Sequence, residues 1–364
     1  MAEFKREGMR RGGNRRDERA KVAAAHTEEM ERRFAKEIEA SAAGTRRIDG
    51  MPKAALKRAA KAAAPEEAAC AVVAEQAETP DAADVETTAV EGAAEAEPVA
   101  APTTGATEQT AAESVSVPAV TVVDQDSVAA ILERGRGRAQ FCDLAVLDFA
   151  SFVHPGGGYE RGSLAQEEAL CSESFLFNVL NRNKDWYAEN RRRNINCNLY
   201  RERALVAPAV RFTRGKTHAY ADVIVAAAPN ADRARSEYNV KSDALERAMR
   251  ERIRFVLAIA DELGHEKLIL GAYGCGVFGW DADTVATMFL DELASGGHVA
   301  KEIVFAIPNV RYNDNFEKFE HALAKFPERN DESFAAAKAA REAAAAAAAN
   351  AEDDEDEDDW RKYL

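Results

Sequence analysis

The chain has 364 residues, enough for one large domain or two of average size, and carries a formal net charge of -15. Most of that charge lies in two low-complexity stretches, one from Pro65 to about Val117 and one from Glu352 to Asp359. This balance argues against nucleic-acid binding through a broadly basic surface. We interpret the basic stretch Arg10–Arg19 as a solvated helix face, and a nucleic-acid arm is the less favoured alternative.

The cysteines offer no framework for disulfides or zinc. There are five of them, an odd number, and no pair has Cys-x-x-Cys spacing. They are Cys70, Cys142, Cys171, Cys197 and Cys275. We find no secretory h-region and no apolar run of membrane-spanning length, and therefore predict a cytoplasmic protein with reduced thiols and no membrane contact. Neither a metal nor a cofactor is expected.

Composition divides the chain into four segments. Residues 1–52 form a charged helical segment, with the helix itself over 16–43, and residues 53–117 are an Ala/Glu/Pro linker. Residues 118–330 form the folded domain, and residues 331–364 are an Ala-rich and acidic tail. The linker and the tail cannot bury enough apolar surface to offset chain entropy, so we expect both to be disordered or frayed.

Strand-like and helix-like patterns alternate through the folded domain. Predicted strands cover residues 117–124, 143–152, 202–210, 220–230, 265–274 and 301–309. Predicted helices cover residues 126–135, 164–180, 241–264, 281–297 and 313–326. This alternation predicts an α/β fold with three layers and a central mixed β-sheet. The strand at 143–152 is apolar enough to be buried on both faces.

A first motif follows that buried strand: three glycines, Gly156–Gly158, and then Gln166, Glu167 and Glu168. The glycines can adopt positive φ and present unobstructed N–H groups, although a flexible turn is the simpler explanation when they are taken alone. Ser163 and Gln166 fit a capping box, which would place the two glutamates in the first turn of a helix. Because successive helical residues are about 100° apart, the two carboxylates cannot do the same job.

A second motif, the glycine-rich loop from Gly271 to Trp280, follows a later strand. Gly274, Gly276 and Gly279 spell GxGxxG, but the expected acidic residue after the next strand is missing, which argues against a dinucleotide-binding Rossmann unit. A phosphate cradle at a helix N-terminus remains compatible with the loop. In and beside this loop, Tyr273 and Phe278 could pack on a sugar or fill the core, and for Phe278 we favour the sugar.

A third segment, Val223 to Asn230, ends in Pro-Asn after a run of small residues. Small side chains would let a flat ligand approach the end of this strand. A plain exit from strand to turn explains the segment equally well, and the sequence does not separate the two readings.

Together the three segments resemble the bacterial-type poly(ADP-ribose) glycohydrolases, a branch of the macrodomain fold. That family carries three glycines, six to eight further residues, and Gln-Glu-Glu. Here seven residues separate Gly158 from Gln166. The similarity covers about Val120 to Asn309. One departure is Asp148, which stands where many bacterial relatives have Asn, and no role is transferred to it.

The resemblance implies a role for each matching position. Glu168 would be the catalytic acid/base, and Glu167 would bind the hydroxyls of the terminal ribose. The two glycine loops would embrace the diphosphate and its adjoining ribose. The implied substrate-binding residues are Gly156, Gly157, Gly158, Gln166, Ser151, Gly274, Cys275, Gly276, Val277, Phe278, Gly279 and Asn230.

The implied reaction is hydrolysis of the ribose–ribose O-glycosidic bond of poly(ADP-ribose), with exo cleavage releasing ADP-ribose. Substrates would be the polymer or ADP-ribosylated proteins. Two alternatives stay open, an ADP-ribose-binding macrodomain that does not hydrolyse the polymer and a mono-ADP-ribosyl hydrolase. A third alternative, an interaction protein that acts through its acidic tail, is less favoured, because we interpret the tail as a solvated extension of the chain.

Overall fold

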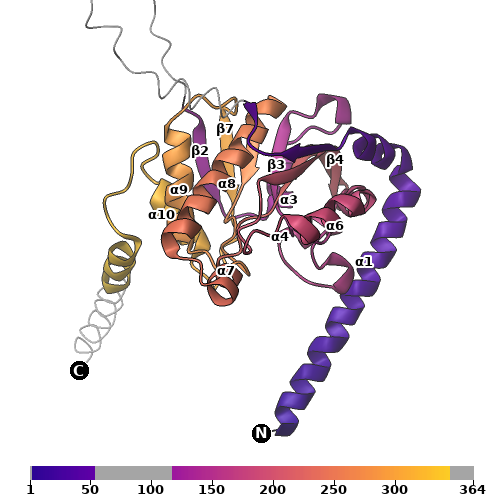
Figure 1. Ribbon diagram of the computed structural model, residues 1–364, viewed down its shortest axis with the longest axis horizontal. Helices are drawn as coiled ribbons and strands as arrows, with labels where there is room; N and C mark the ends of the chain where they lie inside the picture. The colour runs from indigo at the N-terminus through magenta and orange to yellow at the C-terminus, as the bar shows by residue number, and fades with distance from the viewer. Residues whose placement is uncertain (1, 54–116, 345–364) are drawn as a thin grey trace, which may run out of the picture. The chain divides into compact units, whose positions relative to one another are not determined.

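The computed structural model describes residues 2–53 and 117–344, with side chains from residue 15 onward (Figure 1). Most of the predicted linker and the acidic run of the tail lie outside the described residues. The two described ranges belong to one compact unit, so the N-terminal segment is part of the fold that contains the sheet. Within the described ranges, no helix is both long and apolar enough to cross a membrane.

The centre of the fold is a mixed sheet of seven strands in the order β1-β4-β5-β3-β6-β7-β2. The strands are β1 Arg46–Asp49, β2 Ala119–Val123, β3 Leu144–Phe149, β4 Arg203–Arg214, β5 Thr217–Ala226, β6 Lys267–Leu270 and β7 Glu302–Ala306. From β5 to β2 all neighbours are parallel, whereas β4 is antiparallel to both β5 and β1. All six predicted strands are confirmed. The missed strand, β1, is a short polar segment at the edge.

Helices cover both faces of the sheet, which gives the predicted three layers (Figure 1). The alternation along β3 separates the two cores: Ala145 and Leu147 belong to one apolar cluster, and Leu144 and Val146 to the other. The labelled helices are α1 Ala2–Gly44, α3 Ser127–Arg134, α4 Gln166–Ser172, α5 Leu176–Leu180, α6 Lys184–Arg193, α7 Ala231–Tyr238, α8 Ser242–Leu263, α9 Ala282–Ala294 and α10 Asn315–Leu323. Residues 334–344 are helical as well. Three short 3-10 turns are η1 Ala139–Phe141, η2 Tyr159–Arg161 and η3 Asn181–Asn183.

The single helix predicted over residues 164–180 is wrong, because the structure divides it into α4 and α5. Between them the backbone turns to β4: the carbonyl of Glu173 accepts a hydrogen bond from the N–H of Thr213 at 2.7 Å. The Ser174 hydroxyl donates to the carbonyl of Leu170 at 2.6 Å and closes the end of α4. At this point the backbone hydrogen-bonds to β4 instead of continuing the helix.

Helix α1 docks on η2, the turn that follows the first glycine motif. Arg16 and Arg19 donate from their Nε atoms to the carbonyls of Arg161 and Gly162, each at 2.8 Å. The Tyr159 hydroxyl donates to the carbonyl of Ala23 at 3.0 Å. The N-terminal helix therefore supports the segment that leads from the glycines to α4.

Candidate active site

The three predicted motifs meet at one edge of the sheet. Strands β5, β3 and β6 are adjacent and parallel, so the loops that follow them emerge side by side at their carboxyl ends. The Tyr273 hydroxyl donates to the carbonyl of Ala226 at 2.9 Å and so links the loop after β6 to the end of β5. The Phe149 and Tyr273 ring centroids are 5.6 Å apart, which joins β3 to the same loop.

The side chain of Gln166 fixes the first turn of α4 against the end of β3. Its Oε1 accepts from the N–H of Phe149 and its Nε2 donates to the carbonyl of Leu147, both at 2.9 Å. The predicted capping box is wrong, because Ala165 is the N-cap and no side chain caps this helix. The Ser163 hydroxyl instead accepts from Arg16 at 3.2 Å. Gln166 thus positions the glutamates that follow it.

The two glutamates lie in the first turn of α4, as predicted, and each is held by a backbone N–H. Glu167 Oε2 accepts from the N–H of Ser151 at 2.7 Å, and Glu168 Oε1 accepts from the N–H of Gly158 at 2.7 Å. Glu167 is 3% exposed and Glu168 is 7% exposed. Glu167 Oε1 is buried and has no hydrogen-bond partner among the described residues. The two carboxylates are therefore anchored by different parts of the backbone.

Gly157 shows why bare backbone stands beside this pair of carboxylates. Its φ is +60°, and a Cβ there would lie 2.6 Å from Glu167 Oε2 and 2.9 Å from Glu168 Oε1. The expectation of unobstructed N–H groups is wrong, because the N–H of Gly157 donates to the carbonyl of His154, that of Gly158 donates to Glu168, and that of Gly156 is directed at Glu167. The glycines let backbone and carboxylates come into direct contact.

Ser151 supplies the backbone N–H that holds Glu167. Its hydroxyl accepts from the N–H groups of His154 at 3.2 Å and of Val153 at 3.4 Å, which shapes the turn leading into the glycines. The side chain therefore organises the loop, while the main chain carries the contact with the carboxylate.

Asp148 adds a third carboxyl to the site. It is 0% exposed, and neither of its oxygens has a hydrogen-bond partner within the described ranges. Burial and then the negative charge of Glu168 raise the pKa of Asp148 well above its usual range. Burial and the charge of Asp148 likewise raise the pKa of Glu167, although the N–H of Ser151 acts in the opposite direction. The folded site favours the protonated acid at both positions.

Two glycines fix the shape of the second loop. Gly274 has φ +78° and faces Trp280, and Gly279 has φ +73° and lies against Asp232. A Cβ on Gly279 would be 2.0 Å from Asp232 Oδ1, so this exposed side chain would have to move, and the positive φ disfavours any residue other than glycine. The Asp281 side chain then caps α9 by accepting from the N–H of Thr284 at 3.0 Å.

The tip of this loop presents main chain outward. In the part of the chain that the structure describes, the N–H groups of Gly276, Val277 and Phe278 donate to no protein acceptor. Val277 is 84% exposed, and a Cβ on Gly276 would meet nothing within 4 Å. The Cys275 thiol turns inward to the carbonyl of Tyr273 at 3.5 Å, so only its backbone can face a ligand. These features suit an anion held by neutral donors.

The aromatic side chains near the loop have separate roles. Tyr273 is fully buried, which settles the open alternative in favour of the core. Phe278 is partly buried, and its ring lies 6.3 Å from that of Tyr200 in an edge contact. Tyr200 stacks on Phe152 at 4.4 Å, so this aromatic group joins the loops after β3 and β6.

Asn230 closes the third segment as a helix cap. Its Oδ1 accepts from the N–H of Arg233 at 3.0 Å at the start of α7, and the residue is 6% exposed. The plain exit from strand to helix accounts for this side chain.

Arg252 supports the site and was missed in the sequence. It is 0% exposed and donates from α8 to the carbonyls of Ala227, Tyr200 and Arg201, which fixes the backbone behind the aromatic group. The signal was present, because Arg252 falls on the apolar face of α8 between Met249 and Val256.

Comparison with protein families finds one match, to the catalytic domain of microbial-type poly(ADP-ribose) glycohydrolase (PARG), over residues 25–215. The chain belongs to this family. The matched span starts inside α1 and ends after β4, so it includes both glutamates and the first glycine motif. A comparison with curated proteins finds no match.

Solved structures of bacterial PARGs are similar to the chain. The PARG from Thermomonospora curvata is 25% identical, covers 83% of this chain and 98% of its own, and has a TM-score of 0.59. The same enzyme bound to the inhibitor ADP-HPD has a TM-score of 0.58 at 24% identity, with the same shares of the two chains covered. The Deinococcus radiodurans PARG in complex with ADP-ribose is 29% identical, covers 57% of this chain and 85% of its own, and has a TM-score of 0.51.

The chain is therefore a poly(ADP-ribose) glycohydrolase, a glycoside hydrolase that acts on poly(ADP-ribose). The predicted family and its α/β macrodomain-like architecture are confirmed. The family match begins earlier than the predicted span of Val120 to Asn309, because it takes in part of α1 and the edge strand β1, and it ends at residue 215, before the second glycine loop.

Proposed function

We propose that Glu168 is the general acid/base of this PARG and that Glu167 binds and orients the terminal ribose. The observation that carries the proposal is the pair of adjacent glutamates, each held at 2.7 Å by a different backbone N–H around Gly157. Such anchoring fixes two carboxylates in different directions within a buried site. An arrangement of this kind suits acid/base work on one atom and hydroxyl binding on another.

Glu168 is the better placed of the two for proton transfer. It is the more exposed of the pair, and one of its oxygens, Oε1, is already held by the N–H of Gly158. In the protonated form it would donate to the departing ribose oxygen as the glycosidic bond breaks. The resulting carboxylate would then accept a proton from the incoming water, and the leaving ribose carries the first proton away.

Glu167 keeps one oxygen for the substrate. Oε2 is held by the N–H of Ser151, whereas Oε1 is buried without a partner among the described residues. A buried oxygen without a donor is unfavourable, and a ribose hydroxyl would satisfy it. This oxygen would fix the ring so that its anomeric carbon faces Glu168.

The loop at 274–279 is proposed to hold the substrate diphosphate. The N–H groups of Gly276, Val277 and Phe278 are open, and Phe278 offers a ring edge for the adjoining ribose. Positive charge develops on the ribose in the oxocarbenium-like transition state, so a nearby diphosphate stabilises it. Neutral N–H donors hold the diphosphate without cancelling its field, which a bound arginine would do.

We propose exo cleavage of the polymer. The catalytic carboxylates are at most 7% exposed, so the scissile bond has to enter a recess. The end of a polymer enters a recess more readily than its interior does. The two rivals, an ADP-ribose reader and a mono-ADP-ribosyl hydrolase, share the glycine loops but do not need a polymer end.

The test follows free ADP-ribose released from poly(ADP-ribose) by the full chain, Glu168→Gln and Glu167→Gln. We expect Glu168→Gln to lower kcat by about 10²–10⁴-fold, because it removes the acid/base, and to keep ADP-ribose binding. For Glu167→Gln we expect a rise in KM as well as a fall in kcat. Exo cleavage predicts that single ADP-ribose units appear first from end-labelled polymer, with no early intermediate lengths.

Glu160→Gln is the matched control, since Glu160 is an exposed glutamate in η2, close to the same loop but outside the site. It should retain the parent rate. A parent that binds ADP-ribose but releases none from polymer would contradict the role of Glu168. Release only from mono-ADP-ribosylated protein would favour the second rival.

A further inference from the structure

The amino ends of the central strands gather a second set of reactive side chains, at the edge of the sheet opposite the glutamates. Cys142 comes just before β3, Asp222 lies in β5 and His265 comes just before β6. Since β5, β3 and β6 are neighbours, the three residues stand in a row. Their ligand atoms all lie within 4.8 Å of one another.

We propose that Cys142, Asp222 and His265 bind a divalent transition-metal ion of the zinc type.

The spacing of the donor atoms supports this site. With Zn–S near 2.3 Å and Zn–N or Zn–O near 2.0 Å, a tetrahedral ion places sulfur and oxygen about 3.5 Å apart, and nitrogen and oxygen about 3.3 Å apart. Cys142 Sγ lies 3.6 Å from Asp222 Oδ1, and His265 Nε2 lies 2.9 Å from Asp222 Oδ2. Small side-chain movements would bring the three donors to one ion.

The donor set is also chemically suited to zinc. One thiolate, one imidazole and one carboxylate combine soft and borderline ligands, and three protein ligands leave one position for water. Hard cations such as magnesium prefer oxygen ligands throughout. A thiolate and a carboxylate also balance the charge of a divalent ion.

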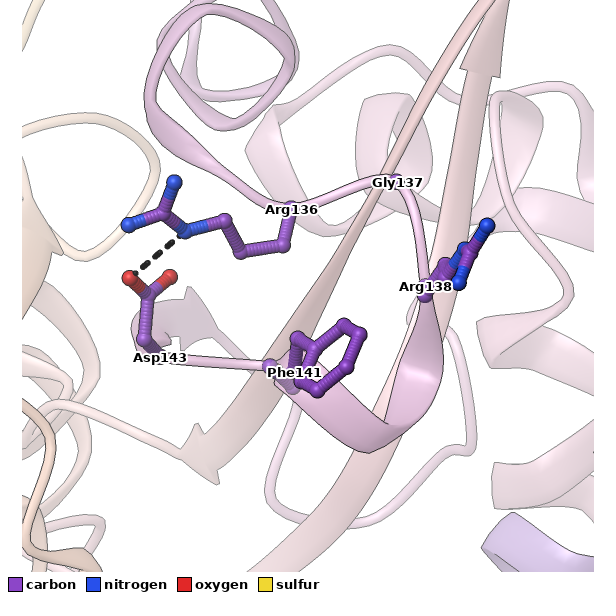
Figure 2. A pocket seen from close by; sticks show the side chains of 6 residues that line it. Arg136, Gly137, Arg138, Phe141 and Asp143 are labelled. Atoms are coloured by element: carbon purple, nitrogen blue, oxygen red, sulfur yellow. Dashed lines mark hydrogen bonds and ion pairs between the residues drawn. The ribbon is translucent and has the colours of Figure 1, made fainter.

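Cys142 is one of the residues that line a cavity of about 740 Å³. Arg136, Gly137, Arg138, Phe141 and Asp143 line the rest of it. Figure 2 shows the Arg136 guanidinium turned to Asp143, with which it forms an ion pair at 3.0 Å. Lys267 also pairs with Asp143 at 3.0 Å. The nearby cations are therefore engaged by Asp143, which leaves Asp222 with His265 as its ionisable partner.

Other contacts hold the ligands in place. Asp222 Oδ1 accepts from the N–H of Ala209 at 2.7 Å, at the irregularity in the pairing of β4 with β5. Asp222 and His265 side chains are 13% and 16% exposed. Burial and the charge of Asp222 raise the pKa of the Cys142 thiol to about 12, so the thiol is protonated at neutral pH in the absence of metal. On binding, the sulfur–metal bond forms as the thiol proton passes to solvent.

The proposed ion would fasten the three strands whose other ends carry the active-site loops. Its expected consequence is stability, because a ligand that binds only the folded state raises the unfolding midpoint. It takes no part in the glycohydrolase reaction, since it sits at the opposite ends of the strands.

The experiment uses the full chain, treated with chelator, dialysed and titrated with Co²⁺. A near-ultraviolet band from thiolate-to-cobalt charge transfer is expected at one equivalent, and Zn²⁺ should remove it by displacement. Cys142→Ser should abolish the band, and His265→Ala should weaken binding by at least about tenfold. Cys197→Ser is the matched control, because Cys197 is an exposed free thiol outside the cluster, and it should keep the band.

Thermal unfolding with and without one equivalent of Zn²⁺ gives a second readout that applies to each folded variant. The midpoint should rise for the parent and for Cys197→Ser, and should rise less for His265→Ala. The proposal is overturned if the parent shows no charge-transfer band, or if the band persists in Cys142→Ser. If Co²⁺ binds but gives no charge-transfer band, its ligands are oxygen atoms elsewhere in the protein, and this result also overturns the proposal.

Discussion

The two ends of the central strands hold their charges in different ways. At the carboxyl ends, Glu167 and Glu168 are held by backbone N–H groups, and Asp148 has no donor within the described residues. At the amino ends, acidic side chains have side-chain partners, as in Asp222 with His265 and Asp143 with Arg136 and Lys267. The backbone donors leave Glu167 Oε1 without a partner among the described residues, whereas at the amino ends neighbouring side chains compensate the charge of the carboxylates.

The same strands therefore carry the groups for the reaction at their carboxyl ends and groups that stabilise the fold at their amino ends. At the carboxyl ends, burial raises the pKa of Asp148 and of Glu167, so ionisation of these two acids destabilises the fold. The amino ends carry compensated groups whose removal should affect the fold and not the reaction. Changes at each end can test this division.

The largest effect is expected from Gly157→Ala. The new Cβ would lie within 3 Å of the carboxylates of Glu167 and Glu168 at a φ of +60°, so both anchored side chains would have to shift. We expect kcat to fall by about 10²-fold, since misplacement of the order of 1 Å can have such an effect. Gly215→Ala is the matched control: its φ is +63° but nothing lies within 4 Å, so it shares the backbone strain alone. Equal loss of activity in both variants would contradict the argument.

A medium effect, on stability, is expected from Asp148→Asn. Because the pKa of Asp148 is raised in the folded state, the parent loses stability as pH rises above the pKa of the unfolded side chain. The variant should therefore be more stable than the parent at pH 7–8, by about 1–3 kcal/mol, and the gain should vanish as pH falls toward 4. Urea unfolding across this pH range measures it.

Asp185→Asn should change the pH dependence of stability in the opposite direction, which gives a comparison for Asp148→Asn. The hydrogen bond from Arg47 lowers the pKa of Asp185, so its contribution is present at neutral pH and is lost in acid. As an exposed ion pair it should contribute at most about 1 kcal/mol. A pH-independent gain in Asp148→Asn would show that the buried charge is not its source.

The smallest effect is expected from Cys142→Ser, measured this time as turnover. Its distance from the glutamates, at the other end of β3, predicts a kcat unchanged within error. A clear loss of turnover in a normally folded variant would break the division between the two ends.

Much of the site could be predicted because the buried strands are recognisable in the sequence as apolar runs. Once three buried strands are parallel, the motifs after them must meet at one edge, and the two glycine loops do so. The separate anchoring of Glu167 and Glu168 follows from helical geometry. By contrast, the use of the Gly158 N–H by Glu168 depends on a backbone path that spacing alone does not define.

The elements that escaped prediction are polar or distant in sequence. Strand β1 reads Arg-Arg-Ile-Asp, and α6 and α7 are rich in charged residues, so none shows an apolar period. The cluster of Cys142, Asp222 and His265 spans segments 80 and 43 residues apart, and no spacing motif relates them. Such sites exist only after the sheet has formed.

Because the N-terminal segment docks on the sheet, the enzyme could be produced as two separate fragments. Strand β1 pairs with β4 from Arg46 opposite Val206 to Asp49 opposite Arg203, and α1 contacts η2, so non-covalent contacts join residues 2–53 to residues 117–344. We therefore expect the covalent link between these two ranges to be dispensable. Fragments 1–58 and 116–364, made separately, should reassemble by complementation, and catalysis would become dependent on fragment concentration.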